Sequence, residues 1–249
     1  MENTLKNRML EIENLNFYIK KNLILKNINV SIEKNKIIAL LGETKSGKTT
    51  LLRCINKTAL FIEKSKIEGT IKINGNNIFE NHLNKACYIV ERPYIFPCSI
   101  MKNILIGLNI KNIKDKNIVS MQIERYLKEV DLWEDVKYKL NNNADRLNFF
   151  QQQKLCLARG LAMKPLLILA DNPTKYFDYE SIIEFEKLLL KLKKNYTIIL
   201  IPRNISQVRR ISDEIIFMSD GKIIEKGPTT KLLEDPETEV LRKFLYINS

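Results

Sequence analysis

A glycine-rich stretch, GETKSGKTT at residues 42–50, constrains the fold of this 249-residue chain more than any other feature. The continuous apolar run KIIALL (36–41) precedes it and is typical of a strand buried on both faces. The stretch TLLRCIN (50–56) follows and is predicted to continue as a helix. A strand, a turn with the pattern Gly-x-x-x-x-Gly-Lys-Thr and a helix together predict a phosphate-binding loop, or P-loop.

The residues of this loop suit the phosphate chain of a nucleotide. Its backbone N–H groups and the positive end of the following helix can cradle phosphate oxygens. Lys48 can reach the terminal phosphates, and the hydroxyl of Thr49 can bind Mg²⁺. Lys45 and Glu43 add opposite charges whose effects can cancel. The candidate nucleotide-binding residues of the loop are Gly42, Glu43, Thr44, Lys45, Ser46, Gly47, Lys48, Thr49 and Thr50.

A second apolar run, LLILAD (166–171), predicts a buried strand that ends on Asp171. We expect this carboxylate to face Mg²⁺ from the strand next to the P-loop strand, so that Thr49 and Asp171 are candidate metal ligands. The residue that follows is Asn172, at a position where a catalytic base would be expected in a metal–phosphate site.

Local patterns predict an α/β fold around this site. Alternation of apolar and polar residues predicts strands with one exposed face at 9–19 and 25–32. The dipeptides Asn74-Gly75 and Asp220-Gly221 are hairpin signals. The alternation of strand and helix patterns after residue 166 is typical of a parallel sheet.

Helical periodicity dominates the middle of the chain. Between residues 93 and 161, stretches such as MQIERYLKEVDLWEDV carry apolar residues at three- and four-residue spacing. We therefore predict one domain over 1–249, with a helical subdomain at 93–161 inserted into a core formed by 1–92 and 162–249.

The composition indicates in which compartment the chain works and which classes of partner it has. The formal net charge is +12, but the lysines are spread along the chain among many Asn and Ile residues, so we expect no nucleic-acid partner. The four cysteines are scattered without a CxxC pair, which argues against a zinc site and against a disulfide framework and favours a reducing cytosol. No apolar run approaches the roughly 20 residues that span a bilayer. We expect a cytoplasmic protein that reaches a membrane by docking on another protein.

The order of these motifs resembles the ABC-type ATPases over nearly the whole chain. The shared features are the P-loop, the inserted helical segment, a QQQ-containing stretch, and the motif D-x-P-T followed by a strand, a turn and a helix. Three stretches are more specifically similar to the ATP-binding subunit of bacterial phosphate-specific (Pst) importers: FPCSIMKNI (96–104), DLWEDVKYKL (131–140) and QQQKLCLARGLAMKP (151–165).

The resemblance implies a fold and a function. It implies a RecA-like P-loop core, an antiparallel β subdomain and an inserted α-helical subdomain that touches membrane permease subunits. It also implies a head-to-tail dimer, with the same chain or with another ATPase subunit, in which each ATP lies between the P-loop of one subunit and the signature motif of the other. The cofactors would be ATP and Mg²⁺, the process phosphate import, and the location the inner face of the cell membrane.

Three of the family's catalytic positions are altered in this chain. Asn172 replaces the glutamate that acts as general base, a role typically worth about 10²–10⁴ in rate, and an amide cannot accept the proton of an attacking water. Arg203 replaces the switch histidine, and the only histidine of the chain, His82, lies upstream of the helical segment. Glu91 replaces the glutamine that links Mg²⁺ to the permease interface.

The signature motif is altered as well, and reads Asn148, Phe149, Phe150 and Gln151 after Leu147. Glycines in such loops allow close backbone approach to a phosphate, so we expect the two phenylalanines to put bulk where that approach occurs and to strain a closed dimer.

Two further positions follow from the resemblance. Tyr18 is the nearest candidate for the aromatic residue that stacks on adenine, although Ile19 aligns with that residue. Asp178 ends the segment KYFD, which corresponds to the family's D-loop.

Several interpretations of the altered residues stay open. Glu91 and Arg203 can form a salt bridge across the site. Alternatively, Glu91 can bind Mg²⁺ or act as the base, with Arg203 as an arginine finger. A third interpretation is drift at a site released from catalysis. We predict an importer subunit that binds Mg-ATP and hydrolyses it poorly; the alternatives are a working ATPase with rearranged residues, and an inactive nucleotide-binding regulator or scaffold without a transport role.

Overall fold

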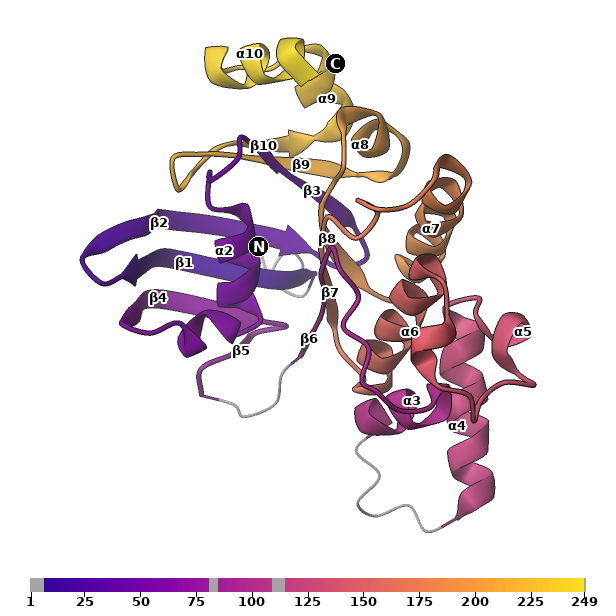
Figure 1. Cartoon of the computed structure of the whole chain (residues 1–249). Coiled ribbons are helices and arrows are strands. Elements are labelled where there is room, and N and C mark those ends of the chain that lie inside the picture. The colour runs from indigo at the N-terminus through magenta and orange to yellow at the C-terminus, as the bar shows by residue number, and fades with distance from the viewer. Residues whose placement is uncertain (1–6, 81–84, 109–114, 249) are drawn as a thin grey trace.

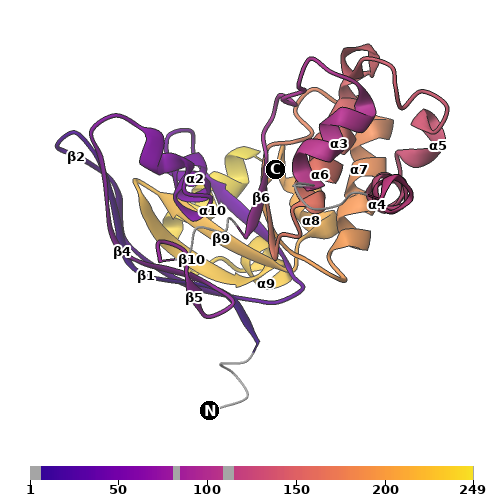
Figure 2. The same cartoon turned by 90° about the horizontal axis from the view of Figure 1, so that it is seen from below.

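The structure is a computed structural model that describes residues 7–80, 85–108 and 115–248 (Figure 1). Two β-sheets lie beside each other, and a group of helices lies at the far edge of the larger sheet. The view from below places helices α3 to α7 together on one side and the smaller sheet on the other (Figure 2). Within the described residues, no helix combines the length and the apolar character needed to cross a bilayer.

The larger sheet carries the P-loop, and its six strands are ordered β10-β9-β3-β8-β7-β6. Strands β9, β3, β8, β7 and β6 run parallel to one another, whereas the edge strand β10 is antiparallel to β9. Their bounds are β3 Ile37–Gly42, β6 Ala86–Ile89, β7 Leu167–Asp171, β8 Thr197–Ile201, β9 Glu214–Ser219 and β10 Lys222–Pro228. The apolar residues of β3, Ile37 to Leu41, are all buried, as the continuous run predicts.

The strand order corrects one expectation. Strand β8 lies between β3 and β7, so Asp171 does not come from the strand next to the P-loop strand. The order of parallel strands depends on where the helices between them pack, and no local sequence pattern encodes it.

The smaller sheet is antiparallel, with the order β2-β1-β4-β5. Its strands are β1 Arg8–Ile19, β2 Asn22–Glu33, β4 Ser65–Ile73 and β5 Asn76–Asn77. Asn74 and Gly75 join β4 to β5 with positive φ angles of 49° and 77°, which confirms the predicted hairpin. Asp220 and Gly221 turn β9 into β10 in the same way, with φ angles of 45° and 73°.

Helices follow the strands in the order expected for an α/β chain. Helix α2 (Lys48–Ile55) follows β3, and the 3-10 turn η1 (Thr58–Phe61) follows α2. Between β6 and β7 come α3 Ile100–Leu108, α4 Lys116–Glu129, α5 Trp133–Val136, the 3-10 turn η2 Ala144–Arg146 and α6 Phe149–Ala162. The remaining helices are α7 Tyr179–Leu192, α8 Ile205–Ile211, α9 Thr229–Glu234 and α10 Glu239–Asn248.

Helix α7 shares the hydrophobic core of the helices that precede β7. Phe185 and Leu189 of α7 belong to the same buried cluster as Ile104, Leu127 and Leu155. The predicted helical subdomain, 93–161, does not include α7. Its limits therefore remain a prediction.

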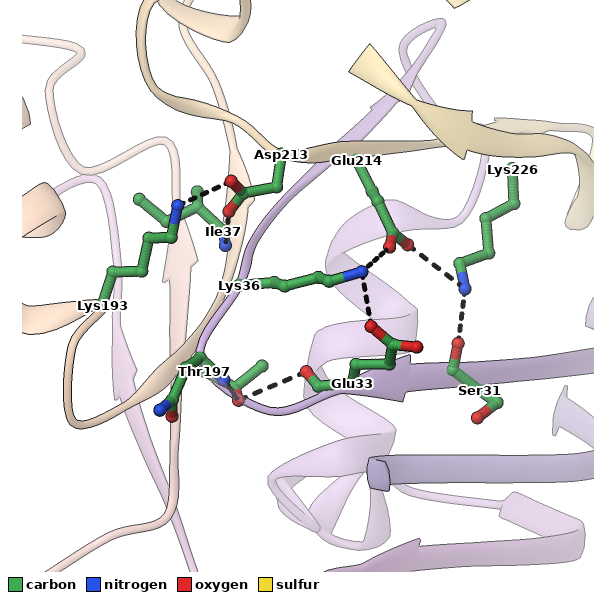
Figure 3. Close-up of polar contacts among 10 residues, drawn as sticks. Ser31, Glu33, Lys36, Ile37, Lys193, Thr197, Asp213, Glu214 and Lys226 are labelled. Carbon is green, nitrogen blue, oxygen red and sulfur yellow. Dashed lines mark hydrogen bonds and ion pairs between the residues drawn. The ribbon is translucent and has the colours of Figure 1, made fainter. Parts of the chain in front are cut away.

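A chain of ion pairs joins the two sheets at the amino-terminal end of β3 (Figure 3). The ammonium of Lys36 lies 2.6 Å from a carboxylate oxygen of Glu33 and 2.5 Å from one of Glu214. Glu214 also pairs with Lys226 at 3.3 Å, and Lys226 donates to the carbonyl oxygen of Ser31 at 2.6 Å. Because Ser31 and Glu33 end β2 while Glu214 and Lys226 lie on β9 and β10, this network links the smaller sheet to the larger one.

Candidate functional site

The P-loop turns on two glycines with positive φ angles. Gly42 has a φ of 144°, and a Cβ atom there would lie 2.1 Å from the carbonyl oxygen of Met218. Gly47 has a φ of 103° and precedes α2 directly. Backbone of this shape strains any residue with a side chain, so the glycines of the predicted pattern are required by the geometry.

The ammonium of Lys48 points back into the loop. It donates to the carbonyl oxygens of Gly42 and Glu43, both at 2.7 Å, and to the hydroxyl of Ser46 at 3.1 Å. Burial lowers the pKa of Lys48, and the nearby carboxylates of Asp171 and Glu43 oppose this shift. A partly buried ammonium favours an anionic partner.

Two cavities adjoin Lys48. The larger, of about 390 Å³, lies between the first half of the loop, the segment after β8 and helix α10, and its lining includes Glu43, Thr44, Arg203, Phe244 and Ile247. The other, of about 320 Å³, is lined by Ile24, Lys45, Ser46, Gly47, Lys48, Thr49 and Thr50. The predicted loop residues therefore line two cavities that share Lys48.

Thr49 and Asp171 meet, as the sequence predicts. The hydroxyl of Thr49 donates to a carboxylate oxygen of Asp171 at 3.3 Å, across from α2 to the end of β7. A hydroxyl and a carboxylate suit Mg²⁺, which is commonly held by one or two protein oxygens together with substrate phosphates and water. The donor set of this chain therefore fits the metal.

Tyr88, on β6, contacts the same carboxylate and was not found by sequence reasoning. Its hydroxyl donates to the second carboxylate oxygen of Asp171 at 3.0 Å. Burial, followed by the charge of Asp171 and the hydrogen bond to it, raises the pKa of Tyr88. The only local signal is a hydroxyl within the apolar run ACYIV, three residues before Glu91.

Asn172 follows Asp171 in a left-handed conformation, with a φ of 48°. Its backbone N–H donates to the carbonyl oxygen of Ile201 at 3.0 Å. Its side-chain oxygen is buried and has no hydrogen-bond partner among the described residues. A buried amide oxygen of this kind can accept a hydrogen bond from water or ligand, but it cannot take a proton.

Glu91 and Arg203 do not form the salt bridge that was one interpretation of their sequence positions. Glu91 pairs with Lys175 at 2.8 Å, and the two side chains are 42% and 45% exposed. Arg203 donates from its guanidinium to the carbonyl oxygen of Phe177 at 3.1 Å, and its backbone N–H donates to Gln207 at 2.9 Å. Each residue has a partner of its own, so the salt-bridge interpretation is wrong.

The signature segment begins α6. Asn148 caps the helix: its side chain accepts from the backbone N–H of Gln151 at 2.8 Å, and the Gln151 side chain accepts from the backbone N–H of Asn148 at 3.3 Å. This reciprocal pair satisfies two N–H groups that a helix start leaves without intrahelical partners.

The two phenylalanines of the signature segment differ in their surroundings. Phe149 is 37% exposed and packs edge-on against Tyr176, with 5.4 Å between ring centroids. Phe150 packs against the ring of Phe177 at 5.2 Å, and the ammonium of the buried Lys154 lies 4.3 Å from its ring centroid. Phe150 is half-buried and packs against the hydrophobic core, whereas Phe149 is the more exposed of the two rings. The expectation that the two rings strain a closed dimer stays a prediction.

Two other candidates, Tyr18 and Asp178, do not line the cavities beside Lys48. Tyr18 donates to Glu68 at 3.2 Å and lines neither cavity beside the P-loop. Asp178 caps α7 by accepting from the backbone N–H of Ser181 at 2.8 Å, which lowers the pKa of its carboxyl. The sole histidine, His82, lies outside the described residues.

Solved structures share this fold. The protein cbiO1 of Clostridium perfringens, part of the ABC transporter complex cbiONQ, matches with a TM-score of 0.78 and 24% identity over 95% of this chain and 94% of that one. The ATP-binding cassette MJ0796, in a dimeric post-hydrolysis state with ADP and Pi, matches with a TM-score of 0.74 and 23% identity over 89% of this chain and 99% of that one.

Sequence comparison defines the family. The phosphate import ATP-binding protein PstB of Thermotoga maritima is 39% identical over 95% of this chain and 97% of that protein. PstB of Idiomarina loihiensis is 35% identical over 95% of this chain and 89% of that protein. The ABC transporter family profile matches residues 25–175. The chain belongs to the ABC transporter family, in which it is a homologue of the phosphate import ATP-binding proteins.

Proposed function

We propose that this chain is the ATP-binding subunit of an ABC importer for phosphate, and that it holds Mg-ATP while hydrolysing it slowly or not at all. The contact between Thr49 and Asp171 beside the partly buried Lys48 carries the proposal of Mg-ATP binding. The names of the relatives support phosphate as the transported ion.

Binding is assigned to residues that the fold brings together. The backbone of residues 42–47 and the ammonium of Lys48 contact the phosphate chain, and Thr49 and Asp171 hold Mg²⁺. Mg²⁺, when bound, neutralises phosphate charge. Lys48 must exchange its bonds with Gly42 and Glu43 for bonds to phosphate oxygens, because one ammonium has only three donors.

Hydrolysis lacks a base at the expected position. Asn172 can orient a water through its buried side-chain oxygen but cannot take the proton of that water. Arg203 is bonded to the carbonyl oxygen of Phe177, and Glu91 is paired with Lys175. These contacts support slow hydrolysis, since none of the three side chains supplies a free carboxylate beside the P-loop.

The proposal also includes the partners and the location. The subunit binds membrane permease subunits on the inner face of the membrane and pairs with a second ATP-binding subunit. The relatives support the transporter context through the phosphate import proteins and the cbiONQ complex, and the dimeric MJ0796 structure supports pairing.

A single-turnover experiment tests the proposal. An excess of the purified chain is mixed with labelled Mg-ATP, and the bound nucleotide is recovered and identified. We expect bound nucleotide that is recovered mainly as intact ATP, and loss of binding in Lys48→Ala. Recovery as ADP contradicts slow hydrolysis, and absence of binding contradicts the assignment as an ATP-binding subunit.

A further inference from the structure

The carboxylate of Asp171 is held at both of its oxygens. Thr49 donates to Oδ1 at 3.3 Å, and Tyr88 donates to Oδ2 at 3.0 Å. The two donors come from different elements: Thr49 lies on α2, and Tyr88 lies on β6, the strand beside β7. The carboxylate therefore has a fixed rotation, with one oxygen directed to the metal-binding hydroxyl and the other to the phenol.

The sheet places Tyr88 for this contact. Strand β6 runs parallel to β7, and Tyr88 is in register with Leu169, two residues before Asp171. The ring of Tyr88 packs against the buried cluster between the two sheets, so its direction is set by packing.

Arg53 is a second charged residue that acts on the Tyr88 phenol, besides Asp171. Its positive charge opposes the rise in the pKa of Tyr88, so the guanidinium lies close to the phenol. Arg53 and Thr49 are four residues apart on α2 and share one face of that helix. Arg53 and Thr49 therefore act on the pair Tyr88 and Asp171 from the same helix, the one that follows the P-loop. A cation close to a phenol favours its ionised form and so makes its hydroxyl a stronger hydrogen-bond donor.

We propose that Tyr88 is a positioning residue that orients Asp171 and thereby sets how much Mg²⁺ contributes to nucleotide affinity. The proposal rests on the proposed Mg-ATP binding. A carboxylate that swings freely must be ordered when the metal binds, whereas one held by Tyr88 is already ordered. Partners that hold metal ligands in this way typically change metal affinity by about 10–100-fold when they are removed.

The test is the substitution Tyr88→Phe, which removes the hydroxyl and keeps the ring. A fluorescent ATP analogue is titrated into each protein in Mg²⁺ and in EDTA. The dissociation constant in EDTA divided by the dissociation constant in Mg²⁺ measures how much the metal contributes to affinity. We expect the ratio to fall about tenfold in Tyr88→Phe, with affinity in EDTA unchanged.

A matched control is Tyr196→Phe. The hydroxyl of Tyr196 also donates to a carboxylate, that of Glu129 at 2.9 Å, and this pair lies between α4 and the start of β8. The control removes the same atom from the same kind of hydrogen bond, so its ratio is expected to equal that of the wild type. A fall of the same size in both variants, or an unchanged or higher ratio in Tyr88→Phe, overturns the proposal.

Two further variants keep the proposal testable if Tyr88→Phe does not fold. They also separate a failure of this proposal from a failure of the proposed function. Arg53→Met removes the positive charge near the Tyr88 hydroxyl, and a smaller fall of the ratio is expected. In the background Asp171→Asn, Tyr88→Phe is expected to have no further effect, because Tyr88 acts through that carboxylate. If the wild type binds no nucleotide, the proposed function fails; if it binds with a Mg²⁺-dependent affinity that neither Tyr88→Phe nor Arg53→Met changes, only the role of Tyr88 fails.

Discussion

The ammonium of Lys175 lies 2.8 Å from the carboxylate of Glu91 and joins the segment after β6 to the segment after Asp171. A second contact runs beside it, since the guanidinium of Arg92 lies 5.4 Å from the ring centroid of Tyr176 and donates to its hydroxyl at 3.4 Å. Glu91 stands at the position where the resemblance predicts the family's glutamine, and in this chain its carboxylate pairs with the ammonium of Lys175.

Replacing Glu91 by Gln is therefore expected to leave nucleotide affinity and turnover unchanged. Both members of the pair are about half exposed, and exposed ion pairs contribute only about 0–1 kcal/mol to stability. Nucleotide titration in Mg²⁺ checks the expectation, with Glu134→Gln as the control because Glu134 also pairs with an adjacent lysine, Lys137. A loss of affinity or turnover confined to Glu91→Gln would favour the interpretation in which Glu91 is a metal ligand or a base.

Asn172→Glu is expected to restore hydrolysis in part. A carboxylate at this position can accept the proton of water, and general-base catalysis suggests a gain of about 100-fold in the single-turnover rate. The control is Asn172→Gln, whose side chain has the length of glutamate but carries no base. Both substitutions introduce the same backbone strain, because residue 172 has a left-handed φ of 48°. Equal amounts of ADP from the two variants would show that another missing group limits the reaction.

Local rules explain which features the sequence predicts. The apolar run of β3, the P-loop glycines and the Asn74-Gly75 hairpin each depend on neighbouring residues, and each is present in the structure. The contact between Thr49 and Asp171 was also predicted, because a P-loop threonine and a strand-ending aspartate share one metal.

The features that sequence reasoning missed depend on contacts through space. Tyr88 reaches Asp171 only because β6 and β7 are adjacent, and 83 residues separate them along the chain. Glu91 pairs with Lys175 and not with Arg203 because the fold brings the segment after β6 beside the segment after Asp171. Side-chain direction in the first turn of a helix is likewise set by packing, which the pair Phe149 and Phe150 illustrates.

That pair gives a stability prediction. Phe150→Ala removes a ring that packs against Phe177, Phe185 and the buried Lys154, and it is expected to lower the free energy of unfolding by about 2–4 kcal/mol. Phe149→Ala, one residue away and 37% exposed, is expected to cost about 0.5 kcal/mol. Urea unfolding of both variants measures the difference, and equal losses would contradict the stabilising packing of Phe150 against the core.

The ion pairs of Figure 3 predict a pH window for stability. Burial raises the pKa of Glu214, but hydrogen bonds from Lys36 and Lys226 outweigh it, so the pKa lies below its ordinary value of 4.5. A lowered carboxyl pKa contributes stability above the unfolded value, and this contribution is lost as the pH falls through the folded value. Hydrogen bonds to Glu214 and Glu33 raise the pKa of Lys36 above 10.5, so its contribution is lost only as the pH rises through that higher value.

Glu214→Gln tests this window because it keeps the shape of the side chain and removes its charge. Glu214 is only 15% exposed, and the substitution leaves Lys36 and Lys226 without their shared anion, so a loss of about 1–2 kcal/mol in the free energy of unfolding is expected at pH 7. The free energies of unfolding of the wild type and the variant are measured in urea from pH 7 downward. The two values are expected to converge below pH 4.5, as Glu214 becomes protonated in the wild type. A difference that stays constant down to the acid limit of folding would mean that Glu214 stabilises the junction between the sheets through packing and not through its charge.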